Sequence, residues 1–132
     1  MKILIHANLN GYGLSKDVEV LRSVLTDHEI TVVAPNREAK GKFDIAFHVE
    51  HLVGRNLSSA KVNVAIPNPE WFSRANGLVL KRCDFAIAKT RYTEKLLRDA
   101  YSTIPVHYTG WTSPDPYIEG EERVKGLVHV GG

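Results

Sequence analysis

Residues 1–13, MKILIHANLNGYG, decide the fold of this chain. Residues 3–7 form a short, continuous apolar run, and a cluster of asparagine and glycine residues follows it. A short apolar run that ends at turn-forming residues is typical of a strand buried on both faces. Ser15 can cap a helix after the turn. The apolar face of that helix would consist of Leu14, Val18, Leu21 and Leu25, which recur at helical spacing.

The remaining chain continues this alternation of strands and helices. Apolar and β-branched runs predict further strands at residues 30–34, 43–49, 61–66, 85–88 and 106–108. Residues 50–59 are expected to form a loop or a poor helix. Alternating strands and helices imply a parallel sheet that is covered on both sides. We therefore expect an α/β fold, with a Rossmann-like parallel sheet of about six strands and helices on both faces.

Two more helix starts are visible in the sequence. Asn68 as cap and Pro69 at the first helical position predict one of them. The pair Asn76-Gly77 is expected to break that helix, and a second short helix is expected at residues 78–82. Thr90 can cap the last helix. Its apolar face would consist of Tyr92, Leu96, Leu97, Ala100 and Tyr101.

The chain divides into three predicted parts. Its length of 132 residues is that of one domain, and residues 1–110 are assigned to a Rossmann-like N-terminal domain. Residues 111–125 are expected to be an interdomain linker, because glycine, proline, serine and threonine are frequent there. Residues 126–132 resemble a strand followed by a glycine turn, as at the start of another domain. Trp111 is expected to fill a gap in the core, and stacking on a sugar stays open.

Composition and charge exclude several classes of function. The net charge is only +2 and no Lys/Arg-rich run occurs, so we expect no nucleic-acid partner. No window approaches the roughly 20 apolar residues of a membrane span, and the first apolar run is too short for a signal peptide. We therefore expect a cytoplasmic protein. Cys83 is the single cysteine, and a buried structural thiol is favoured over a nucleophile.

Ligands of parallel α/β sheets bind beyond the carboxyl ends of the strands, and this rule selects the candidate site residues. At the first strand, Gly11 and Gly13 would let the backbone approach a ligand, and the following helix would attract an anion. A plain turn stays open, because Lys16 leaves the dinucleotide pattern G-x-G-x-x-G incomplete. The same rule selects the whole stretch from Asn8 to Gly13 after the first strand, and Pro35-Asn36 after the second.

Polar residues follow three later strands as well. A polar substrate contact at His48 to His51 is favoured over zinc binding, because no third ligand is evident. Helix capping stays open for Asn68 and Glu70. Two cations at a helix start, Lys89 and Arg91, conflict with the helix dipole and hint at an anion, although a solvated pair stays open. The full set of candidate substrate-binding residues is Asn10, Gly11, Tyr12, Gly13, His48, Glu50, His51, Asn68, Glu70, Lys89, Thr90 and Arg91.

Four segments, in this order, resemble the GT-B glycosyltransferases, a group that includes many retaining enzymes of lipid and polysaccharide assembly. They are residues 1–5 with the glycine loop, residues 43–48, residues 83–90, and residues 105–115 with 127–132. The third segment has the pattern of an aspartate, an apolar strand and a small hydroxyl residue that caps a helix. The last resembles an interdomain crossover and the first strand of a donor-binding domain.

The resemblance implies a two-domain enzyme of which this chain is the N-terminal, acceptor-side half. A nucleotide-sugar donor would bind mainly to the second domain, and a glycan or lipid acceptor would bind here. The resemblance places Gly11, Gly13 and His48 near the cleft, with Lys89 to Arg91 near its floor. No cofactor or metal is implied, and the chain is expected to transfer no sugar alone. Many relatives have a cleft histidine where this chain has Pro67-Asn68-Pro69-Glu70, so that role is not carried over.

Other interpretations of the sequence stay open. One is a free-standing binding or signalling domain of flavodoxin-like shape, and another is a dinucleotide- or flavin-binding module. Self-association through residues 126–130 is a further option, because unpaired strand edges bind one another. Weak association with a membrane surface is another option that stays open.

Overall fold

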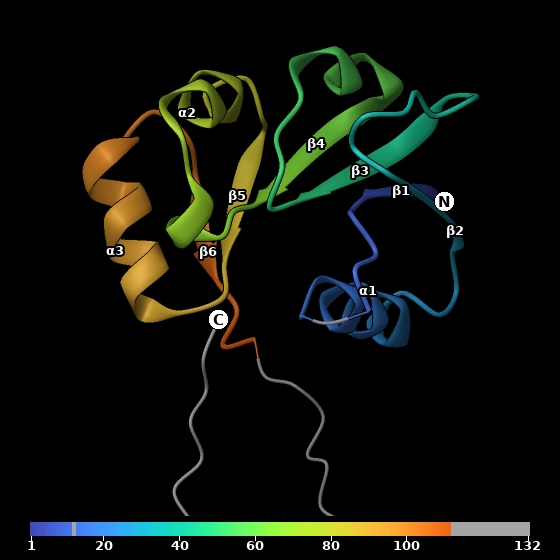
Figure 1. Cartoon of the computed structure of the whole chain (residues 1–132), viewed down its shortest axis with the longest axis horizontal. Coiled ribbons are helices and arrows are strands. Elements are labelled where there is room, and N and C mark those ends of the chain that lie inside the picture. Colours follow the sequence, from blue (N-terminus) through green and yellow to red (C-terminus); the bar gives the residue numbers. More distant parts are fainter. Residues whose placement is uncertain (12, 112–132) are drawn as a thin grey trace, which may run out of the picture.

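The computed structural model describes residues 1–11 and 13–111, and it contains a six-stranded sheet in which every neighbouring pair is parallel (Figure 1). The strand order is β2-β1-β3-β4-β5-β6. This arrangement confirms the predicted α/β, Rossmann-like fold. The strands are β1 (Lys2–His6), β2 (Glu29–Val33), β3 (Phe43–Val49), β4 (Ala60–Ile66), β5 (Phe85–Ala88) and β6 (Val106–Tyr108).

The position of β1 determines where a ligand site can form. β1 pairs on one side with β2 and on the other with β3, so that Ile3 lies opposite both Ile30 and Ile45. The chain therefore leaves β1 in one direction and returns on its other side. Such a reversal of strand order opens a crevice at the carboxyl ends of the two strands, because the connections run away from each other.

One face of the sheet is packed against α1 (Gly13–Val24). Alternate residues of the strands, among them Ile5 and Val64, form a cluster with Val18 and Leu21 of this helix. Both strand residues are fully buried, and each contributes about 1.5–3 kcal/mol by burial. Trp111 packs against the same cluster, as expected for a core contact.

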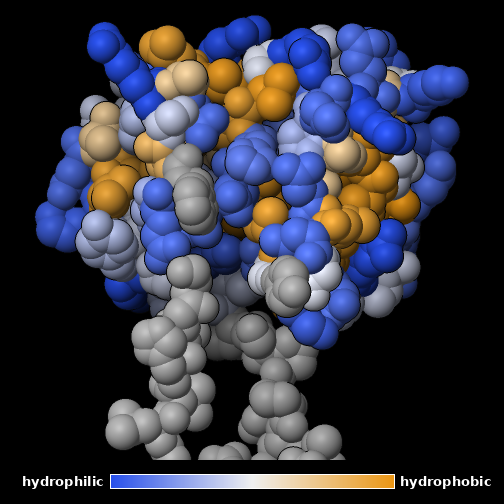
Figure 2. Space-filling view, viewed as in Figure 1, coloured by the Kyte–Doolittle hydropathy of each residue, from blue (hydrophilic) through white to orange (hydrophobic). Residues whose placement is uncertain are grey.

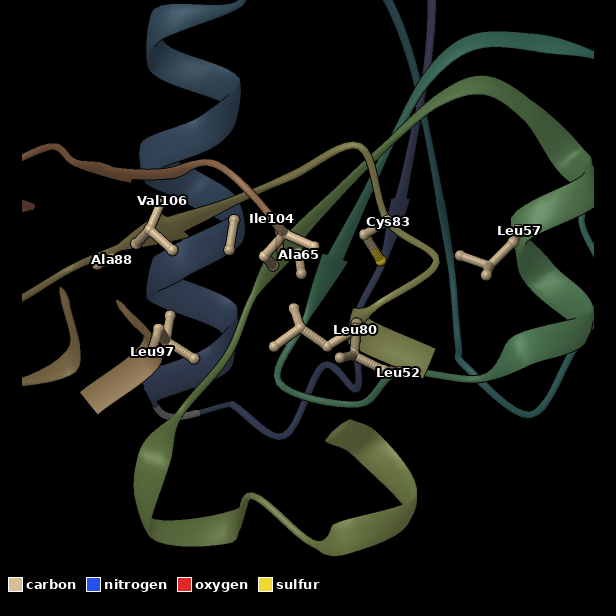
Figure 3. Packing of buried hydrophobic residues seen from close by; sticks show 10 residues of the cluster. Leu52, Leu57, Ala65, Leu80, Cys83, Ala88, Leu97, Ile104 and Val106 are labelled. Carbon is tan, nitrogen blue, oxygen red and sulfur yellow. The ribbon is translucent and has the colours of Figure 1, made fainter. Parts of the chain in front are cut away.

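The opposite face is covered by η1 (Gly54–Ser59), α2 (Arg74–Leu80) and α3 (Arg91–Ala100). Figure 1 shows α1 and the α2–α3 pair on different sides of the molecule. Helices thus cover both faces, as predicted. Leu52 and Leu57, from the connection between β3 and β4, pack with Leu80 in this second core (Figure 3).

Helix ends agree with the sequence in one case and differ in two. Thr90 caps α3, where its hydroxyl accepts a hydrogen bond from Thr93 N at 3.1 Å. Ser15 is not the cap of α1: it lies inside the helix, and its Oγ accepts from Gly11 N at 2.9 Å. The helix expected after Asn68 is only the single 3-10 turn η2 (Pro69–Trp71), and Asn68 makes no side-chain cap hydrogen bond.

The predicted break at Asn76-Gly77 is wrong. Helix α2 runs through both residues, and Ser73 caps it by accepting from Asn76 N at 3.2 Å. Gly77 is buried where the ring of Tyr101 approaches the helix. The glycine therefore serves close packing between α2 and the end of α3 rather than termination.

The surface in Figure 2 mixes polar areas with smaller apolar ones. None of the helices within the described ranges has the length and apolar composition needed to cross a bilayer. Apart from Trp111, the expected linker at 111–125 and the expected strand at 126–132 lie outside the described residues. The cytoplasmic location stays a prediction.

Candidate functional site

A polar pocket of about 460 Å³ lies at the carboxyl ends of the first three strands, where the strand order reverses. Asn8 follows β1, Asn36 follows β2 and His51 follows β3, so each strand delivers one polar side chain to it. This is the position that the topology favours for a ligand. The residues that line the pocket are Asn8, Pro35, Asn36, His51, Leu52, Val53, Arg55 and Asn76.

The loop after β2 is held against the loop after β3 by one charged contact. The turn at Pro35 and Asn36 is closed by Arg37 N, which donates to Ala34 O at 2.9 Å. Arg55 of η1 donates from Nη2 to Asn36 O at 3.0 Å. The guanidinium is thereby placed at the pocket rim with its remaining N–H groups available to other acceptors.

A strained residue directs His51 into the pocket. Glu50 has φ 65°, a left-handed conformation that is uncommon for residues other than glycine. His51 N donates to Val49 O at 2.8 Å, which closes a γ-turn around Glu50, and Glu50 N donates to Ile66 O at 2.9 Å. Such a conformation costs on the order of 1–3 kcal/mol and concentrates at ligand sites. The Glu50 carboxylate lies 3.8 Å from His51 Nε2.

Below the pocket, His6 of β1 and His48 of β3 stack with ring centroids 5.2 Å apart and an interplanar angle of 14°. Neither ring is exposed to solvent. Asn56 connects this pair to the pocket wall, because its Nδ2 donates to Pro35 O at 3.0 Å and lies 3.4 Å from His6 Nδ1. The stacked pair thus supports the floor of the site without contacting a ligand.

Hydrogen bonds define which ring nitrogen of His48 carries the hydrogen. Asn63 Nδ2 donates to Leu57 O at 3.0 Å, so its Oδ1 is the atom that faces His48 Nε2 at 2.9 Å. His48 therefore carries its hydrogen on Nε2. His48 Nδ1 and His6 Nε2 are buried without a hydrogen-bond partner among the described residues. Buried polar atoms of this kind are rare and accompany functional or strained sites.

Burial keeps both rings neutral. Burial is the main cause that lowers the pKa of His6 from 6.5 to about 4, followed by the charge of His48, while the Val33 carbonyl acts in the opposite direction. Burial also lowers the pKa of His48, although its hydrogen bond to Asn63 raises it. The charged form is disfavoured because the surroundings offer it no water.

Of the described candidate substrate-binding residues, His51 is the one that lines the pocket, together with Pro35 and Asn36 from the predicted end of the second strand. Glu50 shapes its rim through the γ-turn. His48 is corrected from a cleft contact to a buried supporting residue, because its ring is fully covered. Asn10 and Gly11 belong to the exposed loop after β1, where Gly11 has φ 76°, and neither lines the pocket. Gly13 begins α1, and Tyr12 lies outside the described residues.

The cations after β5 are paired within the chain. Lys89 forms a salt bridge with Asp17 of α1 at 2.8 Å. Arg91 pairs with Glu94 at 2.8 Å and covers the ring of Tyr108, with its Cζ 3.8 Å from the centroid. The expected conflict with the helix dipole is therefore resolved by carboxylates and an aromatic face. Neither cation lines the pocket, and neither do Thr90, Asn68 and Glu70.

Four lining residues had no clear signal in the sequence. Leu52, Val53 and Arg55 come from the connection that was predicted as loop or poor helix, and Asn76 was assigned to a break. No motif distinguishes them, because tertiary packing of η1 and α2 over the sheet brings them to the edge. Asn8 and Asn36, in contrast, can be predicted from the rule that ligands of parallel α/β sheets bind beyond the carboxyl ends of the strands.

The Cys83 thiol and the metal-ligating side chains are the other reactive groups of the described residues. Burial, and secondly the charge of Asp84, raise the pKa of the Cys83 thiol to about 11 despite the nearby Arg82. This agrees with a structural cysteine, since a thiol with that pKa is hardly ionised at neutral pH. In residues 1–11 and 13–111, no group of three or more His, Cys, Asp and Glu side chains is arranged to hold a metal ion.

Comparisons with known protein families, with curated proteins and with solved structures find no match for this chain. The fold and the pocket geometry are therefore the basis for any functional assignment.

Proposed function

We propose that this chain is the acceptor-side half of a glycosyltransferase, which moves a sugar from a nucleotide-sugar donor to a glycan or lipid acceptor. The observation that carries the proposal is the polar pocket at the strand-order reversal between β1 and β3. The four sequence segments that resemble GT-B enzymes support it. The donor would bind mainly to a second domain.

The lining of the pocket suits a hydroxyl-rich ligand. Asn8, Asn36 and Asn76 carry amides, which both donate and accept hydrogen bonds, as sugar hydroxyls do. Val53, which is half-buried, adds apolar surface on which the C–H face of a sugar ring can rest. A few polar groups around an apolar wall are typical of small-molecule sites, because they fix the orientation of the ligand.

The chemistry would be substitution at the anomeric carbon of the donor. In this scheme the pocket holds the acceptor so that its hydroxyl faces that carbon, which turns a bimolecular encounter into an oriented reaction. Dipoles and cations of the donor domain would hold the leaving phosphates. We assign no catalytic residue within this chain and expect it to transfer no sugar alone.

The first test is saccharide binding by the full 132-residue chain, measured by amide NMR at millimolar ligand. We expect mono- or disaccharides to shift the signals of Asn8, Asn36 and His51. Asn36→Ala should weaken binding several-fold, because one donor and one acceptor are lost. Ser102→Ala, an exposed change after α3, serves as the control. Absence of saccharide binding at the pocket, or sugar transfer by the chain alone, would contradict the proposal.

The strand order favours one second candidate. Flavodoxin-like sheets have the order 2-1-3-4-5, and this sheet follows that order with β6 added. A free-standing domain of that type would bind a flavin or another phosphate-bearing ligand beside β1. Purified protein that is yellow, or that absorbs as a bound nicotinamide, would favour this candidate over the first.

A further inference from the structure

We infer that the pocket recognises an anionic group, a phosphate or a carboxylate, on its ligand, with Arg55 as the main contact and Arg82 beside it. This inference rests on the proposed function and narrows it: the acceptor would be a phosphorylated or carboxylated saccharide. The juxtaposition of uncompensated cations with hydroxyl-binding amides carries it.

The pocket lining carries the positive charge of Arg55. None of the described Asp and Glu residues belongs to this lining. The Glu50 carboxylate lies 3.8 Å from His51 Nε2, and the Glu50 side chain is only 12% exposed. It forms no salt bridge with Arg55 among the described residues. A cation in such a concave site concentrates anions, because its field is focused there.

Arg55 has the geometry for an oxyanion. Its hydrogen bond from Nη2 to the backbone oxygen of Asn36 orients the guanidinium without neutralising it. Arg55 forms no salt bridge with a carboxylate within residues 1–11 and 13–111. Its free N–H groups match the paired oxygens of a phosphate or carboxylate, which arginine binds in bidentate fashion.

A second guanidinium lies next to the same turn. Gly54 begins η1, one residue before Arg55, and a Cβ at Gly54 would lie 3.4 Å from Arg82 Nη1. Arg82 also forms no salt bridge in the described part of the chain. Because Gly54 has no side chain, the Arg82 guanidinium can lie close to the start of η1, next to the residue that carries the Arg55 guanidinium.

The cations of α3 and of the loop before it contrast with these two arginines. Every one of them pairs with a carboxylate: Lys89 with Asp17, Arg91 and Arg98 with Glu94, and Lys95 with Asp99. The unpaired guanidinium of Arg55 in the pocket lining therefore distinguishes the pocket from the other carboxyl-end candidate, the loop after β5. This contrast selects the pocket, and not Lys89 and Arg91, as the anion site.

The test titrates the full 132-residue chain with glucose, glucose 6-phosphate, glucuronate and inorganic phosphate at constant ionic strength, followed by amide NMR. We expect at least one anionic sugar to bind about tenfold more tightly than glucose and to shift Asn36, His51 and Arg55. Arg55→Gln should remove that preference, and Arg55→Lys should keep part of it. Arg98→Gln, which removes a cation paired with Glu94, is the matched control.

Each outcome has a distinct meaning. Glucose binding as tightly as both anionic sugars at the pocket overturns the anion inference and leaves the saccharide proposal intact. Inorganic phosphate binding at Arg55 without any sugar preference supports the anion site and removes the saccharide proposal. No binding at the pocket overturns both. Circular dichroism of each variant separates loss of binding from loss of folding, and Arg55→Lys, with its charge retained, repeats the test if Arg55→Gln does not fold.

Discussion

His6 and His48 are two histidine rings that face each other inside the sheet, on neighbouring strands and in register. One nitrogen of each ring lacks a hydrogen-bond partner among the described residues, and both rings are fully buried. Protonation of both rings would place two cations in a fully buried site, with the ring centroids 5.2 Å apart. These residues therefore make the protein sensitive to acid.

We predict that stability falls as the pH is lowered from 6.5 toward about 4. In that window the unfolded chain binds a proton at His6 that the folded chain rejects, so acid favours unfolding. The loss from His6 alone is on the order of 3 kcal/mol at the lower end, because its pKa falls from 6.5 to about 4. Urea unfolding at a series of pH values measures it.

NMR titration of the histidine rings provides the control for this prediction. The His6 ring signals of the folded protein should stay those of the neutral form at pH 5.5. Exchange of the exposed His107 for Gln should leave the pH dependence of stability in place. Protonation of His6 near pH 6.5 without unfolding would contradict the interpretation.

At the scale of single elements, α2 shows how packing overrides local preference. Gly77 lies inside this helix, where glycine costs about 1 kcal/mol relative to alanine. A larger residue would clash at this position, because an added Cβ would lie 3.0 Å from Cε1 of Tyr101 and still closer to the Tyr101 hydroxyl oxygen. The helix thus contains a residue of low helix propensity, because glycine leaves room for the Tyr101 ring.

We predict that Gly77→Ala destabilises the protein by about 1–3 kcal/mol, because overpacking exceeds the gain in helix propensity. Thermal or urea unfolding measures the change. Adding Tyr101→Phe should recover part of the loss, since it removes the atom nearest to the new methyl group. Ala75→Gly, at an exposed position of the same helix, calibrates the propensity effect. A net stabilisation by Gly77→Ala would contradict this prediction, because it would show that the Tyr101 ring moves aside without loss of stability.

At the scale of the whole molecule, Lys89 and Asp17 join parts of the chain 72 residues apart. Their side chains are only 23% and 13% exposed, and they connect α1 with the start of α3. Breaking a partly buried pair leaves the remaining charge without compensation, so the bridge holds α1 to the carboxyl edge of the sheet.

We predict that Lys89→Met destabilises the protein by about 1–3 kcal/mol, and that the double variant Asp17→Asn/Lys89→Met loses less than the sum of its two single changes. Urea unfolding of the four proteins completes the cycle. Lys61→Met, which breaks the more exposed pair with Asp44, should cause a smaller loss. Equal losses of stability from Lys89→Met and Lys61→Met would mean that burial does not increase the contribution of the Lys89 pair.

Local patterns were sufficient for the strands and for the start of α3, but not for η2 and α2. The predicted strands at 43–49, 85–88 and 106–108 have the same bounds in the structure, and Thr90 caps α3 as expected. Strands can be predicted from short apolar runs between turn residues, because this pattern involves only a few neighbouring residues. The α/β fold follows from their alternation. The rule of strand ends also indicated Asn8, Asn36 and His51 as site positions.

Tertiary structure alone decided the strand order, the pocket and the partners of the charges. His48 follows the same local pattern whether it faces a cleft or the core, and only the packing of η1 and Asn63 above it buries the ring. Lys89 has its carboxylate partner 72 positions earlier, which no local pattern reveals. Arg55 reaches the pocket because the β3–β4 connection folds over the sheet. Local sequence patterns therefore predict the strands and most of the helix positions. Contacts between distant residues, which depend on three-dimensional packing, determine which side chains those segments present to a ligand.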